Sequence, residues 1–538
     1  MDTGVIEQYC RVCLDVPDIP PRLRQAYQTL QESPEDFAKG LKLAATLWDS
    51  SAFRACVNLL DLVDVQTPDQ MGAKELLLEL CGLELGLEQN HERRPTHLDK
   101  IDPSGEHVSE ILNMVYRKSA AFYIHGHFQK SRDIYNAVLP HDFRLHAVNS
   151  GTLSKEGTKV EVLDSDIEQL RSRLIAASET GHPVSDARPP SAALLDDITP
   201  EDIASLKGRR ILLILRENYF ESSDSRKSEI KKHFCASTET LGMDVSFFSA
   251  NPFIHYASGD KGARIRALTD LVKLIQETKP EFVVFENLCA QPGDTLLTPE
   301  HYAETLARLR SAFNFKLIAM YPDAWSPESI FGLSCAEAFA DTIWHLSYSS
   351  HLKFNEAIQK KSAVVPFPYS FTFGDSQPER DLGATFMGAA QAYNFLRPLW
   401  FMAIEDGHIP FKLILTQPIK QPGRLTLTNQ EYAALLRRIR ISVQFSARDV
   451  TTKILCGRVW ESILAGCALL EEDNIETRQL LVPYLHYIPF NSIHDLAVAV
   501  ACLEKYPEER EALAQQGFDW GTRVLDPGKL WAHVLLKA

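Results

Sequence analysis

The chain has 538 residues, more than one hydrophobic core usually supports, so we expect two or three domains. Its composition, 45% hydrophobic and 24% charged residues, is typical of a globular protein. A net charge of −15 argues against nucleic acid as the main partner, because phosphate backbones select basic surfaces.

Residues 1–180 are expected to form helices. Apolar residues recur at helical spacing in 40–63 and again in 121–139, each time around a short polar turn. The pattern resembles tetratricopeptide helical hairpins, with Phe53 and Phe128 in matching places 75 residues apart and Ser131 where such repeats favour alanine. We predict a divergent, TPR-like array whose groove holds a partner or a protein acceptor. The alternative is a helical bundle that only packs on the next domain.

Residues 181–204 have the proline-rich, polar composition of a linker, and Thr199 and Pro200 open a short helix as its cap and first residue. From 205 to 375, short apolar strands alternate with amphipathic helices, which predicts a parallel sheet covered on both faces. The right-handed crossover rule makes this a Rossmann-like, doubly wound domain. Its expected strands are 211–215, 245–248, 282–285, 317–321, 342–346 and 363–366.

A second alternating set lies within 376–538, and the polar stretch 374–380 at its start is a natural hinge between the two sets. Two Rossmann-like halves joined by a hinge form a cleft, and ligands bind outside the carboxyl ends of the strands. The expected strands are 384–387, 411–415, 441–445, 467–470 and 487–489.

The stretch 457–495 carries the sharpest motif. It reads as a helix with Arg458 and Glu461, a buried strand, the acidic turn Glu471-Glu472-Asp473, a second helix start with Glu476 at capping-box spacing from Asp473, and a strand. A carboxylate with an arginine three residues before it can bind a polyol and a phosphate at the same time. These residues resemble the C-terminal half of GT-B glycosyltransferases, above all the subgroup related to the spore maturation protein CgeB. The resemblance implies two facing Rossmann-like domains, with the last helix crossing back onto the first.

The resemblance also implies a donor site. Glu461 would accept hydrogen bonds from the ribose hydroxyls of a nucleotide sugar, because a carboxylate offers two oxygens to a vicinal diol. Arg448, Lys453 and Arg458 bracket the same loop and would neutralise the leaving diphosphate. Solvated ends of a surface helix are the alternative. Better-known retaining enzymes have a second glutamate eight residues before the first, but Lys453 stands there, which leaves the stereochemical outcome open.

Four further residues are candidates on the donor side. Gly388 resembles the glycine that lets the backbone approach the ligand, and Arg397 lies on the helix after it; a plain turn is the alternative. The acidic turn Glu471–Asp473 lies at the carboxyl end of a buried strand and is expected to face the cleft, where Glu472 and Asp473 would either bind sugar hydroxyls or only cap a helix.

On the acceptor side the first candidate is Asp323, in Tyr-Pro-Asp-Ala-Trp after a buried strand, where the CgeB-like group often has an acidic residue followed closely by tryptophan. A carboxylate there would act as general base on an acceptor hydroxyl if burial raised its pKa. A simple turn aspartate is the alternative. Glu286, at the end of another buried strand, is the second catalytic candidate.

The chain has no phosphate-loop lysine motif, no G-x-G-x-x-G and no G-x-S-x-G, which argues against kinases, nicotinamide dehydrogenases and serine hydrolases. Scattered cysteines and the lack of a leader or long apolar run favour a cytoplasmic protein without a transmembrane segment. We therefore expect a metal-independent GT-B glycosyltransferase that uses a nucleoside-diphosphate sugar, no cofactor, and a glycan, protein or metabolite acceptor. The alternatives are a non-catalytic binding scaffold and a nucleotide-sugar epimerase.

Overall fold

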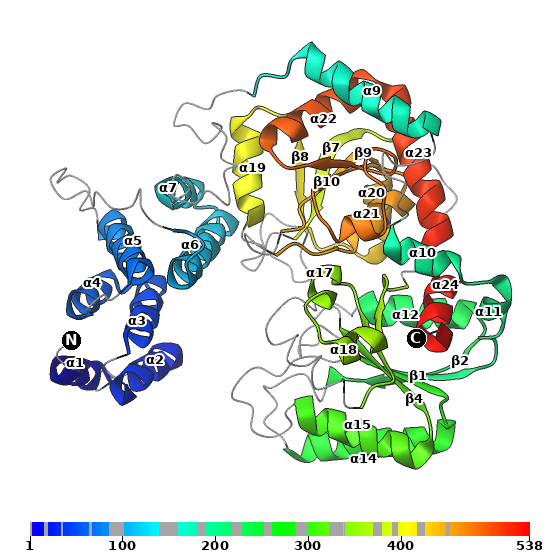
Figure 1. Ribbon diagram of the computed structural model, residues 1–538, viewed down its shortest axis with the longest axis horizontal. Helices are drawn as coiled ribbons and strands as arrows, with labels where there is room; N and C mark the ends of the chain where they lie inside the picture. Colours follow the sequence, from blue (N-terminus) through cyan, green and yellow to red (C-terminus); the bar gives the residue numbers. More distant parts are fainter. Residues whose placement is uncertain are drawn as a thin grey trace. The chain divides into compact units, whose positions relative to one another are not determined.

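The computed structural model describes residues 3–14, 20–33, 36–63, 67–85, 102–138, 160–180, 189–217, 229–251, 261–286, 299–321, 337, 339–368, 379–389, 396–416, 425–447 and 452–537 (Figure 1). The chain divides into two compact units. One is made of Met1–Val160, Ala390–Ile409 and Ala447–Thr451, and the other of Glu161–Ala389, Pro410–Ser446 and Thr452–Ala538. No helix within the described ranges is both long and apolar enough to cross a membrane.

The first unit is built from helices that turn back on one another. α3 (Phe37–Asp49) and α4 (Phe53–Leu62) form one hairpin, and α6 (Glu106–Ile124) and α7 (Phe128–Val138) form another, where the sequence periodicity predicted them. Gly126 adopts a φ of +84° in the second turn, a conformation that glycine reaches without steric cost. The unit also contains α1 (Thr3–Leu14), α2 (Pro21–Glu32), α5 (Pro68–Leu85) and α19 (Leu396–Asp406).

Small side chains let α6 and α7 approach closely. The Ser119 hydroxyl donates to the Ser131 carbonyl at 2.7 Å, and both serines are fully buried. Beside them the rings of Tyr116 and Tyr135 stack with their centroids 5.8 Å apart. The polar group of Ser131 is therefore satisfied inside the hairpin.

The second unit contains two parallel sheets, as the sequence predicted. Among the described residues, six strands of the first sheet pair in the order β2-β1-β3-β4-β5-β6, which is a doubly wound order with its switch between β1 and β3. They are β1 (Arg210–Leu215), β2 (Asp244–Ser249), β3 (Phe282–Glu286), β4 (Lys316–Tyr321), β5 (Thr342–His345) and β6 (Ser362–Val364). The helices that accompany them are α12 (Glu229–Thr240), α14 (Lys261–Thr278), α15 (Pro299–Phe313), α17 (Tyr348–His351) and α18 (Glu356–Lys361).

The second sheet has the order β11-β10-β9-β7-β8 in the described residues, again with all strands parallel. Its strands are β7 (Leu382–Gly388), β8 (Lys412–Leu415), β9 (Ile439–Gln444), β10 (Ala468–Glu472) and β11 (Ile488–Phe490). Its helices are α20 (Asn429–Arg437), α21 (Arg458–Leu464), α22 (Ile493–Lys505) and α23 (Pro507–Val524). Capping boxes at Thr428 and Ser492 start α20 and α22, because each side chain accepts from the backbone amide three residues on.

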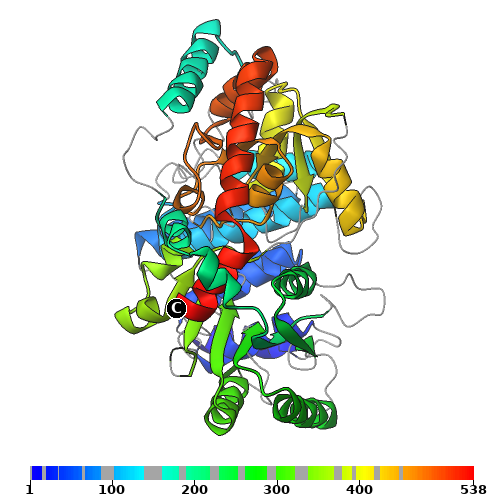
Figure 2. The ribbon, with the colours of Figure 1, turned by 90° about the vertical axis from the view of Figure 1, so that its right-hand side faces the viewer.

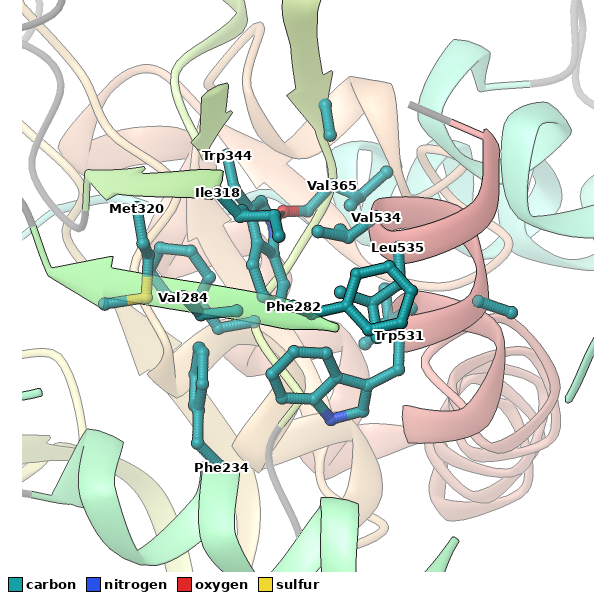
Figure 3. Packing of buried hydrophobic residues seen from close by; sticks show 14 of the residues in the cluster. Phe234, Phe282, Val284, Ile318, Met320, Trp344, Val365, Trp531, Val534 and Leu535 are labelled. Atoms are coloured by element: carbon teal, nitrogen blue, oxygen red, sulfur yellow. Dashed lines mark hydrogen bonds between the residues drawn. The ribbon is translucent and has the colours of Figure 1, made fainter. Parts of the chain in front are cut away.

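The end of the chain packs on the first sheet. After α23, the helix α24 (Pro527–Ala532) places Trp531 in the core cluster of that sheet, with its ring centroid 5.3 Å from that of Trp344 and 5.2 Å from that of Phe234 (Figure 3). The Trp531 indole N–H donates to Ser237 Oγ at 2.9 Å, so the buried ring loses no hydrogen bond. This apolar contact fixes the C-terminal segment to the first sheet.

Three helices that precede β1 also belong to this unit: α9 (Asp164–Thr180), α10 (Pro190–Asp196) and α11 (Pro200–Ala204). The threonine cap and first-turn proline predicted for the last of them are confirmed. α9 lies along α22 and α23 (Figures 1 and 2), where Arg171 pairs with Glu509 at 2.6 Å. The first described helix after 138 thus packs on the second sheet's helices.

The capping box predicted from Asp473 and Glu476 is wrong. The segment forms a 3₁₀ turn, η8 (Thr477–Gln479), without a side-chain cap. Asp473 instead pairs with Arg478 at 2.7 Å. Glu476 accepts a hydrogen bond of 2.6 Å from the backbone amide of Tyr348 at the start of α17, and so joins the two sheets' domains. Neither carboxylate caps the turn, because Asp473 pairs with Arg478 and Glu476 accepts from the amides at the start of α17.

Candidate functional site

Polar side chains gather where three neighbouring strands of the second sheet end. β7 ends at Gly388, β9 at Gln444 and β10 at Glu472, and β9 pairs with both of the others. Since all three strands are parallel, their carboxyl ends meet at one edge. This is the edge at which doubly wound sheets bind ligands.

Arg458, the first residue of α21, lies across this edge. Its Nε donates to Gln444 Oε1 at 3.0 Å, and its guanidinium carbon lies 5.7 Å from the ring centroid of Phe386. A Cβ on Gly388 would lie 3.2 Å from Arg458 Cδ and Nε. The glycine therefore makes room for the arginine, which explains in packing terms why the two predicted residues lie together.

A buried hydrogen-bond network holds the side chain and the backbone carbonyl of Arg458. Gln444 donates through Nε2 to Ser442 Oγ at 2.9 Å, and the hydroxyls of Ser442 and Ser462 lie 2.7 Å apart. Ser462 Oγ donates to the Arg458 carbonyl at 2.6 Å, which returns the network to the helix that carries the arginine. Because Gln444, Ser442 and Ser462 are fully buried, the guanidinium has a fixed anchor.

Glu461 lies one turn after Arg458 on the same helix face. Its Oε2 accepts a 2.6 Å hydrogen bond from the hydroxyl of Tyr432, on α20. Burial, followed by the charge of Glu461, raises the pKa of Tyr432 well above its ordinary value, so the phenol stays protonated and donates. Glu461 itself is half-buried. A cation and an oriented carboxylate thus stand side by side.

Lys453 faces the acidic end of β10. Its Nζ lies 3.2 Å from Glu472 Oε1 and donates to the Asp473 carbonyl at 2.7 Å. Glu472 is buried and also accepts from the backbone amide of Ser446 at 3.2 Å. Lys453, Glu472 and Asp473 therefore form a second group, and the lysine charge is balanced by Glu472.

Glu471 differs from its two acidic neighbours. Strand alternation turns it to the opposite face from Glu472, where it is fully buried. Burial raises its pKa to about 8, so it is mostly protonated at neutral pH. The expectation that all of 471–473 faces a cleft is therefore wrong for Glu471.

The other predicted residues lie elsewhere. Glu286, at the end of β3, is buried and makes an ion pair of 2.9 Å with Arg216. Arg397 is buried in α19, in the first compact unit. Asp323 and Arg448 fall outside the described residues. Within the described ranges, no three His, Cys, Asp or Glu side chains cluster as they would around a metal ion.

Sequence reasoning missed the residues that hold the site. Tyr432 and Gln444 support Glu461 and Arg458, yet neither belongs to a recognisable motif. Gln444 had one weak signal, a polar residue at the end of an apolar strand. Tyr432 had none, because its partner lies 29 residues further along the chain.

Residues 398–535 match a family model described as "Glycosyl transferase-like". Three solved structures are similar to this chain. HepE from Anabaena, in complex with UDP and glucose, is 10% identical over 60% of this chain and 97% of its own, with a TM-score of 0.39. Sucrose-phosphate synthase from Thermosynechococcus elongatus is 11% identical over 61% and 97%, with a TM-score of 0.42. The glycosyltransferase SsfS6 from Streptomyces sp. SF2575 is 10% identical over 59% and 96%, with a TM-score of 0.29. No curated protein matches the sequence.

Proposed function

We propose that the chain transfers a sugar from a nucleoside-diphosphate sugar to an acceptor hydroxyl on a glycan, a protein or a metabolite. The observation that carries the proposal is the pair Arg458 and Glu461 at the carboxyl ends of β7 and β9, inside the segment that matches the glycosyl transferase-like family model. A guanidinium binds phosphate oxygens and a carboxylate binds a vicinal diol, and a nucleoside diphosphate offers both.

The donor-side roles follow from these positions. Glu461 accepts from the ribose hydroxyls, Arg458 neutralises the leaving diphosphate, and Gly388 leaves room for the Arg458 side chain beside the ligand. Since Lys453 is paired with Glu472, we assign both, with Asp473, to the sugar hydroxyls rather than to the diphosphate. The donor-side roles of Arg397 and Arg448 stay predictions, because Arg397 is buried in α19 of the first compact unit and Arg448 lies outside the described residues.

On the acceptor side we propose Asp323 as the general base. Glu286 is the second candidate, although it would first have to separate from Arg216. In this scheme cationic side chains such as Arg458 neutralise the negative charge of the leaving diphosphate, so no metal ion is needed. Buried free cysteines, such as Cys56, Cys467 and Cys502, support a reducing, cytoplasmic location.

The proposal also covers the subgroup of glycosyltransferases that the chain resembles and the role of its helical domain. The motif Arg458 to Asp473 favours the CgeB-like subgroup of GT-B enzymes. The hairpins α3–α4 and α6–α7 support a TPR-like array, which would recruit the acceptor.

Calorimetry with UDP, GDP, ADP and dTDP tests the proposal directly. We expect one of them to bind with and without EDTA, and Arg458→Ala to weaken that binding by about 10- to 100-fold, the loss of a charge-assisted hydrogen bond. Lys412→Ala, an exposed cation at the amino end of β8, is the matched control and should bind normally. A folded protein that binds none of the four would be a scaffold instead. Isomerisation of a donor without acceptor would make it an epimerase.

A further inference from the structure

The first compact unit contains a groove of about 800 Å³. It is bordered by α3 and α6, with Arg22 of α2 and the two hairpin turns at its margins. All of the residues that line it belong to this one unit, so the groove is a property of the helical domain itself.

The groove is basic although the chain is acidic. Its described lining has four cations, Arg22, Lys42, Arg117 and Lys118, and two carboxylates, Asp49 and Glu110, in a protein whose net charge is −15. Asp49 pairs with Arg22 at 3.1 Å, and this pair adds no net charge, so the other charged lining residues are three cations and Glu110. The local field of the groove therefore favours a negative occupant.

Lys118 fixes one of these charges in place. The side chain is buried, and its Nζ donates to the Trp48 carbonyl at 2.6 Å and lies 4.1 Å from the centroid of the Trp48 ring. An ammonium held by a carbonyl and an aromatic face keeps its position with little loss of side-chain entropy on binding. Lys42 and Arg117 are exposed and line the same groove.

The shape and the apolar surface decide between kinds of anion. The lining residues of α6 run from His107 to Phe122, which at 1.5 Å per residue is about 22 Å, the length of six or seven residues of an extended peptide. The half-buried Met114, Ala121 and Phe122 line the same groove and give it apolar surface. A free phosphate needs neither the length of the groove nor its apolar contacts. A nucleic acid would be repelled by Glu110 and by the net negative charge of the chain.

We propose that this groove binds an extended peptide segment in which acidic residues alternate with apolar ones. Its acidic side chains contact the exposed Lys42 and Arg117, and its apolar side chains pack on the half-buried Met114 and Phe122. The link to catalysis rests on the proposed function, since the segment would then belong to a protein acceptor. Peptide binding itself requires no donor.

Fluorescence anisotropy with a labelled ten-residue peptide of alternating Glu and Leu tests the proposal. We expect saturable binding that weakens as salt rises, and at least tenfold weaker binding to the double variant Lys42→Glu/Arg117→Glu. The matched control is Arg11→Glu/Arg24→Glu, which makes the same charge change on exposed residues of α1 and α2 outside the groove, and it should bind like the wild type. Equal losses in the two double variants would overturn the proposal.

Two further measurements keep the outcome unambiguous. A peptide of alternating Lys and Leu should bind the double variant Lys42→Glu/Arg117→Glu better than the wild type, because the charge of the groove is reversed, and circular dichroism of the variant should match that of the wild type. Binding of a ten-nucleotide oligo(dT) as tight as that of the acidic peptide would mean a general anion surface and would refute the peptide assignment. Calorimetry with the nucleotides on the same samples separates a failure of this proposal from a failure of the donor site.

Discussion

The hydroxyl of Tyr432 donates a hydrogen bond of 2.6 Å to Oε2 of Glu461. The tyrosine is on α20, which precedes β9, and the glutamate is on α21, which follows it. The hydrogen bond therefore links the two helices that flank β9 in the sequence. Because the phenol is buried and its pKa is raised, by burial first and by Glu461 second, it stays a donor across the physiological pH range. The carboxylate is thereby held in one orientation at the edge of the sheet.

Tyr432→Phe should weaken nucleotide binding. The substitution keeps the ring and removes the hydrogen bond that orients Glu461, which is worth about 1–2 kcal/mol, or roughly a 5- to 30-fold change in Kd. Calorimetry with the nucleotide that binds the wild type measures the effect. The free energy of unfolding should fall by a similar or smaller amount.

Tyr506→Phe is the matched control. The Tyr506 hydroxyl also donates to a glutamate, Glu168 on α9, but at an exposed contact between α9 and α22–α23. Removing that hydrogen bond should leave the nucleotide affinity unchanged. If both tyrosine variants weaken binding equally, the effect of Tyr432 is a general loss of stability.

Glu461→Gln and Glu461→Ala should separate function from stability. The glutamine keeps an oxygen that accepts from Tyr432, so we expect at least tenfold weaker nucleotide binding with a nearly unchanged melting temperature. The alanine also leaves the buried Tyr432 hydroxyl without its acceptor, which should cost about 1–3 kcal/mol of stability. Thermal unfolding and calorimetry on both variants check this. Normal affinity in the glutamine variant would assign Glu461 to structure alone.

Gly388→Ala should disturb the donor site through Arg458. The new Cβ would lie 3.2 Å from Arg458 Cδ and Nε and 3.1 Å from Phe386 Cζ, so the arginine has to shift, at a cost of about 1–3 kcal/mol. We expect weaker nucleotide binding. Gly383→Ala, at the other end of β7, meets only the ends of the flexible Glu504 and Arg440 side chains and should bind normally. A Gly388→Ala protein with full affinity would show that Arg458 is not held at this edge.

The buried Glu471 should make the protein less stable as pH rises. Its pKa is raised from the ordinary value of 4.5 to about 8, so between these values the unfolded chain has lost a proton that the folded chain keeps. This contribution is fully present below about pH 4.5, declines as pH rises, and is lost above about pH 8. In denaturant unfolding from pH 5 to 9, the free energy of unfolding should therefore fall until about pH 8, and Glu471 should cause no further fall above that pH.

Glu471→Gln provides the test of that assignment. The amide cannot ionise, so the difference in unfolding free energy between variant and wild type should grow in favour of the variant from pH 5 to 8 and then level off. Glu508→Gln, an exposed carboxylate at the start of α23, should show no such trend. A difference that does not change with pH would mean that Glu471 is ionised throughout this range.

Local patterns in the sequence were sufficient for the architecture and for part of the candidate site. Apolar runs such as those of β1 and β9 alternate with amphipathic helices, and this alternation determines parallel sheets because a strand covered on both faces has no polar side. Gly388, Arg458 and Glu461 were chosen because their segment resembles the donor-side half of GT-B glycosyltransferases, and each follows a strand or lies in the first turns of a helix, positions that a chain can encode within a few residues. The roles proposed for them are still predictions.

Only the tertiary structure decided how those residues are held. Tyr432, 29 residues from Glu461, and Gln444, 14 residues from Arg458, are joined to their partners through the packing of β9 against α20 and α21, and no local spacing encodes such contacts. The same holds for the acidic turn, where Glu472 binds Lys453 while its neighbour Glu471 is buried and protonated. Periodicity determines which face of a strand a side chain takes, but the environment of that face, and with it the charge of a carboxyl group, depends on elements far along the chain.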